Sequence, residues 1–206
     1  MSARTLGSTV LTVLLAVVAA GCADKSAPET VAPAGFVAVR DAGAGFAVAV
    51  PADWIQIPLT NDLDDFDEKS RGLIASNEAL IPAINQARQL AQSGGELMAV
   101  TADGRSRINL TVFKAPEDSL EEIARETVPR LEAEGATEIQ QSQAPTGAGT
   151  ALRITFKYPL PGRGEEVSIA NEVQYYLLKG GKSYVITIIN GSAEVVQAVA
   201  DSLRIR

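Results

Sequence analysis

The chain of 206 residues contains no histidine, one cysteine and one tryptophan. Histidine is the commonest general base in enzymes and the commonest protein ligand of transition metals, so its absence excludes many classes of enzyme. With Cys22 as its single thiol, the chain can form no internal disulfide, no zinc finger and no Cys-His catalytic pair. Chemistry based on carboxylates, lysine or serine remains open.

Basic side chains are also few. The 18 Lys and Arg residues face 25 Asp and Glu residues, which gives a net charge of −7. A chain with this charge is repelled by phosphate backbones, so we expect no nucleic acid partner. It is also repelled by anionic lipid unless something else holds it at a membrane. The hydrophobic content of 46% and the length are typical of one globular domain with appendages.

No apolar run is long enough to span a bilayer, which takes about 20 residues. The longest, VLTVLLAVVAA at Val10–Ala20, follows Arg4 and precedes Gly21 and Cys22. This order is typical of a secretory signal peptide. The AAGC ending resembles the lipobox of bacterial lipoproteins, which implies cleavage between Gly21 and Cys22 and a diacylglycerol, carrying acyl chains such as palmitate, on the cysteine sulfur. An ordinary secretory signal with an incidental cysteine is the alternative. We favour lipidation because spacing and residue type coincide.

These features divide the chain into three parts. We expect residues 1–21 to be the signal peptide, residues 22–35 to be the lipidated N-terminus with a disordered tether, and residues 36–206 to be a single domain. The tether sequence ADKSAPETVAPAG is too poor in large apolar residues to order itself. The expected membrane contact is the lipid on Cys22, and the expected location is the extracytoplasmic face of a bacterial membrane.

Hydrophobic periodicity predicts the elements of the domain. Residues 63–93 should form two helices, interrupted at Gly72 and Pro82, and Ser119 with Glu122 predicts a capping box at the start of a third. Asn171 interrupts an apolar strand face, for which we favour a β-bulge over a polar group in a cavity. Glycine turns at 103–104 and 180–181 indicate hairpins, hence antiparallel pairing. The predicted fold class is α+β, an antiparallel β-sheet sandwiched by helices. Strands are expected at residues 36–40, 46–50, 55–59, 98–100, 108–112, 152–158, 167–178 and 184–189, with the last helix within 191–203.

The segments FAVAVPADW (Phe46–Trp54) and DSLRI (Asp201–Ile205), with the helices and hairpins between them, resemble the PsbP-like α/β sandwich. The resemblance is greatest to actinobacterial lipoproteins of the LpqN/LpqT type, which also carry a lipobox and a tether. It implies a surface-held binding module without established catalysis. Histidine metal sites of photosystem PsbP proteins are not expected, because this chain has no histidine.

The segment NDLDDFDEK concentrates five acidic residues: Asp62, Asp64, Asp65, Asp67 and Glu68. Carboxylate oxygens could bind Ca²⁺, although the glycine of an EF-hand loop is missing. Acidic residues also stabilise the N-terminus of a helix through its dipole, and we favour this interpretation.

Three aromatic residues are candidate contacts for a ligand or partner. Trp54 could stack on a ligand, but we favour packing at the edge of the sheet because exposing so large an apolar group is costly. Tyr175 and Tyr176 are adjacent in a predicted strand and should point to opposite faces.

Three functions remain open. The first is a non-catalytic, membrane-anchored binding module for an envelope protein or a small apolar ligand, which an apolar pocket between sheet and helices would favour. The second is a scaffold or assembly factor for an envelope or secreted protein, which a flat apolar patch would favour. The third is a carboxylate- or metal-dependent hydrolase, which carboxylates with raised pKa in a cleft would favour. We expect no enzyme, no cofactor, and neither catalytic nor metal-binding residues.

Overall fold

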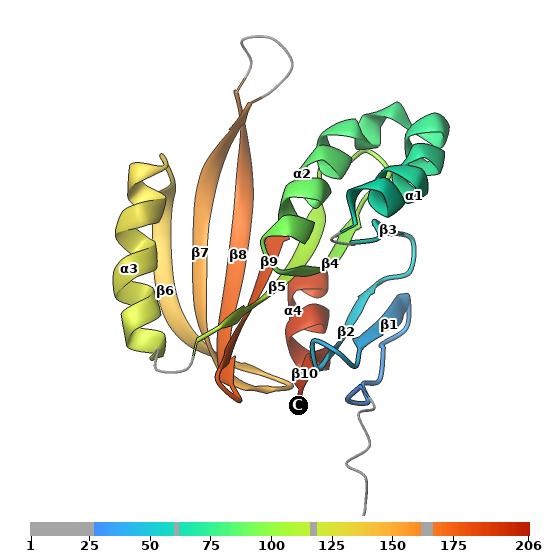
Figure 1. Ribbon diagram of the computed structural model, residues 1–206. Coiled ribbons are helices and arrows are strands. Elements are labelled where there is room, and N and C mark those ends of the chain that lie inside the picture. Colours follow the sequence, from blue (N-terminus) through green and yellow to red (C-terminus); the bar gives the residue numbers. More distant parts are fainter. Residues whose placement is uncertain (1–26, 60–61, 116–118, 162–166) are drawn as a thin grey trace, which may run out of the picture.

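The computed structural model describes residues 27–59, 62–115, 119–161 and 167–206 (Figure 1). The strands are β1 (Phe36–Asp41), β2 (Phe46–Pro51), β3 (Ile55–Gln56), β4 (Gly95–Val100), β5 (Arg107–Lys114), β6 (Thr137–Thr146), β7 (Gly149–Pro161), β8 (Val167–Lys179), β9 (Lys182–Ile189) and β10 (Arg204–Ile205). The helices are α1 (Leu63–Ser76), α2 (Ile81–Gln92), α3 (Leu120–Ala133) and α4 (Ala193–Ser202), and the 3-10 turn η1 (Glu78–Leu80) joins the first two.

Seven strands form one antiparallel sheet in the order β3-β4-β5-β9-β8-β7-β6. Two of its hairpins turn at the predicted glycines. Gly104 between β4 and β5, and Gly180 with Gly181 between β8 and β9, have positive φ, a conformation that glycine adopts without steric cost. Both predicted hairpins are confirmed.

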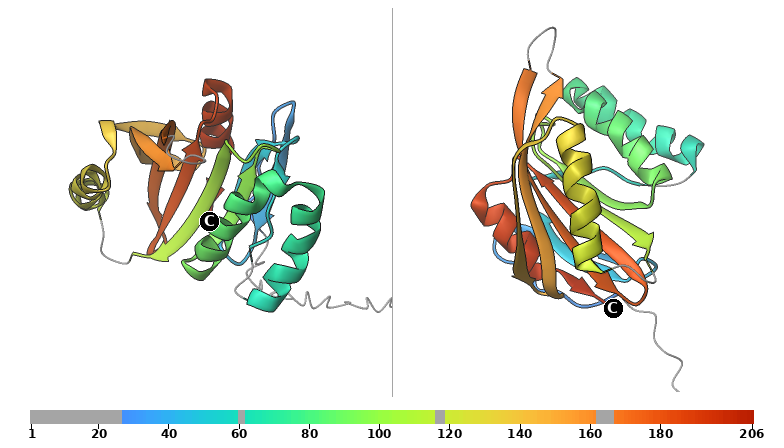
Figure 2. Two further views of the ribbon diagram at one scale, coloured as in Figure 1. Left: turned by 90° about the horizontal axis from the view of Figure 1, so that it is seen from above. Right: turned by 90° about the vertical axis from the view of Figure 1, so that its left-hand side faces the viewer.

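One face of this sheet is covered by a second sheet, β1-β2-β10, and by α4 (Figure 2). Every residue of β2 is buried, because β2 lies between its own sheet partners and the larger sheet. The Oγ atom of Ser202, at the end of α4, accepts a hydrogen bond of 2.9 Å from the backbone N–H of Ala49. Among the described residues, β10 pairs only with Phe46 and Ala47 of β2. Further along β2, α4 therefore supplies the acceptor for a backbone N–H group.

The other face is covered at two places, with a strip of sheet between them. Helices α1 and α2 pack over Met98 and Val100 of β4, while α3 packs over the outer strands β6, β7 and β8. Strands β5 and β9 lie between these two layers (Figure 1). The predicted fold class, an α+β domain with an antiparallel sheet between helices, is confirmed.

Helix ends agree with the predicted capping, apart from the break at Gly72. The Ser119–Glu122 capping box is present at the start of α3, and Pro82 lies in the first turn of α2, where a missing N–H costs nothing. Gly72, however, lies inside α1, which continues to Ser76. The break occurs at Asn77, whose side chain accepts the N–H of Ala79 and so favours a new helical start.

Two predictions for the strands were wrong. Strand β6 was not expected, since its sequence TEIQQSQAPT is polar and lies largely exposed at the edge of the sheet. Asn171 forms no bulge. It pairs with Lys157 in an unbroken register and is exposed, because no helix covers the β7–β8 strands at this end within the described part of the chain. The next hydrophobic residue on its face, Ile169, is 58% exposed.

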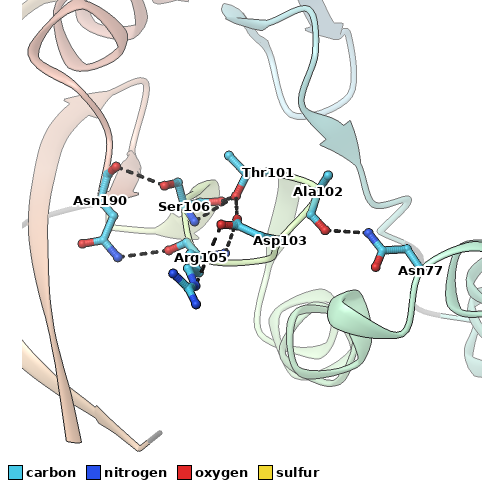
Figure 3. A network of polar contacts seen from close by, with 7 residues as sticks. All are labelled: Asn77, Thr101, Ala102, Asp103, Arg105, Ser106 and Asn190. Atoms are coloured by element: carbon cyan, nitrogen blue, oxygen red, sulfur yellow. Dashed lines mark hydrogen bonds and ion pairs between the residues drawn. The ribbon is translucent and has the colours of Figure 1, made fainter.

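The turn between β4 and β5 is tied to two neighbouring elements (Figure 3). Asp103 accepts hydrogen bonds from the Thr101 hydroxyl at 2.6 Å and from the Arg105 N–H at 3.0 Å, and these bonds lower the pKa of the Asp103 carboxyl. Asn190, which follows β9, donates to the Arg105 carbonyl at 3.0 Å. On the other side, the Asn77 amide donates to the Ala102 carbonyl. These bonds hold the start of β5 in place.

Candidate ligand-binding site

The structure gives each predicted site residue a different setting. Gly21 and Cys22 lie outside the described residues. Trp54 is half-buried and packs against the main core. Tyr175 and Tyr176 are 4% and 6% exposed on opposite faces of β8, and the Tyr176 hydroxyl donates to the Gln174 side chain. Burial raises the pKa of Tyr176. The structure brings none of these aromatic residues together in an open site.

The acidic segment begins α1. Asp62 is the N-cap, and its carboxylate accepts the N–H groups of Asp64 and Asp65 at 3.0 and 3.2 Å. Asp67 forms an ion pair with Arg88 of α2. Among the described residues, no three acidic, histidine or cysteine side chains are grouped closely enough to hold a metal ion. The segment is thus an acidic helix start, with Asp62 as the N-cap and Asp64 and Asp65 in the first turn.

A charged hollow, which sequence reasoning missed, lies where the β1–β2 turn meets β4, β5 and β9. We call it the Glu96 hollow. Its volume is about 400 Å³, and it holds two carboxylates, two lysines and one aromatic ring. The lining residues are Asp41, Gly43, Ala44, Glu96, Val112, Phe113, Lys114 and Lys182.

A β-bulge places Glu96 in this hollow. Across β4 and β5, Gly95 pairs with Thr111 and Leu97 pairs with Leu110, so Glu96 is an extra residue without a pairing partner in this register. A bulge changes the direction of the side chain that it carries. Both preceding glycines are required: Gly94 has φ +85°, and a Cβ atom on Gly95 would lie 2.5 Å from the Leu90 side chain and 2.7 Å from its carbonyl oxygen.

The opposite wall is the turn between β1 and β2, which is held by several hydrogen bonds. The Asp41 carboxylate accepts the Ala44 N–H at 2.7 Å. The Ala44 carbonyl in turn accepts the Tyr184 hydroxyl at 3.0 Å and the Lys182 ammonium at 3.5 Å. Gly45 has φ +82°. The hollow therefore has two fixed walls, each dependent on glycine.

The electrostatics of the hollow centre on Glu96. Glu96 is exposed overall, but partial desolvation raises the pKa of its carboxyl, repulsion from Asp41 raises it further, and attraction by Lys182 opposes these effects only in part. The ionised carboxylate is therefore under-compensated and would be stabilised by an added cation. Phe113 is 44% exposed and offers an apolar surface beside the charges. Lys114 and Lys182 line the same hollow, so a ligand with a cationic end and an apolar body fits only with its cation beside Glu96 and its apolar body on the Phe113 ring.

The sequence held one signal for this site. Gly94 and Gly95 follow the helical stretch predicted to end at residue 93, and a glycine at the start of a strand also indicates a bulge or a close backbone approach. Asp41 and Lys182 could not be connected with Glu96 from the sequence, because they are far apart along the chain and meet only through the sheet order.

A second, more apolar hollow of about 470 Å³ lies between the N-terminal segment and α4. Its walls include Val31, Phe36 and Ala198. Thr30 is 6% exposed, and its hydroxyl donates to the Ser202 carbonyl. The chain is therefore held to the domain from Thr30 onward, earlier than the predicted end of the tether at residue 35, because the segment gains contacts with α4 that its composition does not reveal.

Comparisons with known proteins show similarity at the level of the fold. No protein-family model matches the chain, and no curated protein sequence matches it. The solution structure of CyanoP, the cyanobacterial PsbP of Synechocystis, matches with a TM-score of 0.49 and 11% identity, over 87% of this chain and 98% of that chain. LpqN of Mycobacterium tuberculosis, described as involved in cell envelope biogenesis, matches with a TM-score of 0.44 and 10% identity, over 78% of this chain and 82% of that chain.

A crystal structure from Bacteroides thetaiotaomicron also matches, with a TM-score of 0.45 and 13% identity, over 78% of this chain. The match spans 45% of that protein, so this chain corresponds to less than half of it. The resemblance to PsbP and to the LpqN type expected from the sequence is thus found among the structural neighbours. No helix within the described residues is long and apolar enough to cross a bilayer.

Proposed function

We propose that this chain is a lipid-anchored, extracytoplasmic binding module without catalytic activity. The anchor is the diacylglycerol expected on Cys22, since the apolar run and the AAGC ending match a lipoprotein signal. Two acyl chains suffice for stable attachment to a membrane. The acidic domain, with its net negative charge, is then kept at the membrane by the lipid rather than by its surface.

The observation that carries the binding role is the Glu96 hollow. A bulge and a braced turn fix its shape, so it is largely formed before a ligand arrives. Its carboxylates and the exposed Phe113 ring favour an organic cation, or a basic side chain of a partner, whose apolar part lies on the ring. The charged Glu96 hollow differs from the apolar pocket between sheet and helices that a purely apolar ligand would need.

The anchor is tested by mass spectrometry of the protein purified from bacterial membranes. We expect a mature N-terminus at Cys22 carrying the mass of a diacylglycerol. In a Cys22→Ala variant this mass should be absent and the protein should leave the membrane fraction. A wild-type protein with an unmodified Cys22 would refute the proposed anchor and leave the binding role to be judged separately.

The binding role is tested by thermal unfolding with three matched probes: benzylammonium, benzyl alcohol and benzoate. A ligand that binds only the native state raises the melting temperature. We expect benzylammonium to raise it most, with the effect lost in Glu96→Gln and reduced in Phe113→Ser. Glu132→Gln, at an exposed position of α3, is the matched control and should respond like the wild type. Equal stabilisation by benzyl alcohol would show that the carboxylates play no part.

The raised pKa of Glu96 also favours a second candidate, a carboxylate-dependent hydrolase. A carboxyl with a raised pKa beside a second carboxylate can act as a general acid. The assay is hydrolysis of 4-nitrophenyl glycosides and esters by the wild type and by Glu96→Gln. Hydrolysis that Glu96→Gln abolishes would support this candidate, and hydrolysis of the same rate in both proteins would exclude Glu96 from catalysis.

A further inference from the structure

The strip of sheet between α2 and α3 carries a patch of polar side chains, which we call the polar island. Its position follows from the strand register. Arg107 and Glu172 pair with Ile189 from opposite sides, and Asn109 and Gln174 pair with Thr187 in the same way, so these residues share one face. Apolar residues under the two helical layers flank them on both sides. The members of the island are Arg107, Asn109, Thr111, Glu172, Gln174 and Thr187.

Within the described residues, Arg107 is a cation without a direct partner. It forms no ion pair there within 4.0 Å, and in the same part of the chain its buried Nε atom has no hydrogen-bond acceptor. Burial lowers the pKa of Arg107, and the charge of Glu172 opposes this only in part. Arg107 is half-buried, and a partly desolvated charge without an ion partner is stabilised by an added counter-charge, so the guanidinium is suited to bind an oxyanion.

Asn109 carries an unsatisfied acceptor two positions along β5. It is 7% exposed, and within the described part of the chain its buried Oδ1 atom receives no hydrogen bond. An unsatisfied buried acceptor costs about 1–3 kcal/mol. Among the residues that the structure describes, Arg107 therefore needs an acceptor and Asn109 needs a donor.

Glu172 supplies a negative charge on the far side of β9. One of its oxygens accepts the Gln174 amide at 2.7 Å, and burial raises the pKa of the Glu172 carboxyl. The Cα atoms of Arg107 and Glu172 lie two strands apart, about 10 Å. Since Ile189 between them is 3% exposed, the two charged side chains stand on either side of an apolar residue. Their charges attract each other, but the two groups, both in the described part of the chain, form no ion pair within 4.0 Å.

We propose that the polar island binds a small zwitterion of the α-amino-carboxylate type. Its carboxylate would accept hydrogen bonds from the Arg107 guanidinium, and its ammonium group would donate to the Glu172 carboxylate. A zwitterion satisfies both charges at once, whereas a simple anion would be opposed by Glu172 and by the net charge of −7. The island is separate from the Glu96 hollow, because Arg107 and Phe113 are six residues apart on β5, about 20 Å.

The experiment is an NMR titration of the chain from residue 22 onward, produced without lipid, with L-alanine, propionate and ethylammonium. The last two each carry one of the two charged groups of L-alanine. We expect saturable shifts of the Arg107, Asn109 and Glu172 amide resonances with L-alanine, and binding at least about tenfold tighter than that of propionate or ethylammonium, which corresponds to about 1.4 kcal/mol.

Arg107→Gln and Glu172→Gln should each reduce the affinity for L-alanine at least about tenfold. Arg107 and Glu172 are only half-buried and, among the described residues, form no ion pair within 4.0 Å, so each domain variant should still fold, and thermal melts verify folding of each one. Arg153→Gln, on the opposite face of the sheet, is the matched control and should bind normally. Three results would overturn the proposal. They are propionate binding as tight as that of L-alanine, no saturable shift with L-alanine up to about 10 mM, and unchanged binding of L-alanine by both folded variants.

Discussion

The bulge that places Glu96 leads to a sharp prediction about glycine. In Gly95→Ala the new Cβ atom would lie 2.5 Å from Leu90 Cγ and 2.7 Å from the Leu90 carbonyl oxygen. Since one of these contacts is with the backbone of α2, a side-chain rotation cannot relieve it, and either β4 or the end of α2 must move. Overpacking of this kind costs about 1–3 kcal/mol. For a domain of this size the melting temperature should fall by about 2–4 °C per kcal/mol.

Gly72→Ala is the matched control. Gly72 lies inside α1, and within the described residues a Cβ atom added there would have no neighbour closer than 4 Å outside the local helix. Alanine should therefore stabilise the helix by about 0.5–1 kcal/mol. Calorimetry of both variants measures the two opposite shifts. The Glu96 carboxyl, followed by NMR, should regain an ordinary pKa in Gly95→Ala as it leaves the hollow. A Gly95→Ala protein that melts at the wild-type temperature or above would refute the account of the bulge.

Two further predictions concern the same hollow. Tyr184→Phe removes the buried hydrogen bond to the Ala44 carbonyl and should destabilise the domain by about 1–2 kcal/mol. Tyr158→Phe, at a half-buried tyrosine of β7, is the comparison in denaturant unfolding and should change stability less. Equal losses of stability in the two variants would contradict a stabilising role for the Tyr184 hydrogen bond. Because the pKa of Glu96 is raised in the folded state, the native protein binds more protons than the unfolded chain just above pH 4.5. Stability should therefore decline as pH rises through this range and the folded pKa, and Glu96→Gln should flatten the curve; an unchanged curve would show that Glu96 does not titrate as described.

Local sequence patterns were sufficient to predict the features that depend on a single short segment. The capping box of α3, the Gly180–Gly181 turn and the acidic start of α1 were predicted from neighbouring residues, since backbone conformation and capping depend on a few adjacent positions. β6 was missed for the same reason. Its polar sequence has no buried face to produce alternation, and only pairing with β7 makes it a strand.

The sites required the tertiary structure. Glu96 is one glutamate among many in the sequence, and it becomes distinctive because a bulge directs it toward Asp41 and Lys182 from other strands. Arg107 and Glu172 likewise become neighbours only because β9 inserts between β5 and β8. Nothing in the local sequence of either residue encodes that insertion.

The sequence by itself determined the antiparallel α+β class, the positions of most helices and turns, and the expectation of a lipid anchor at Cys22. These follow from periodicity, glycine conformation and a contiguous motif, all of which are local. The tertiary structure alone decided which charged groups share a surface and which of the described ones lack a partner, because desolvation and charge pairing depend on residues brought together from distant parts of the chain.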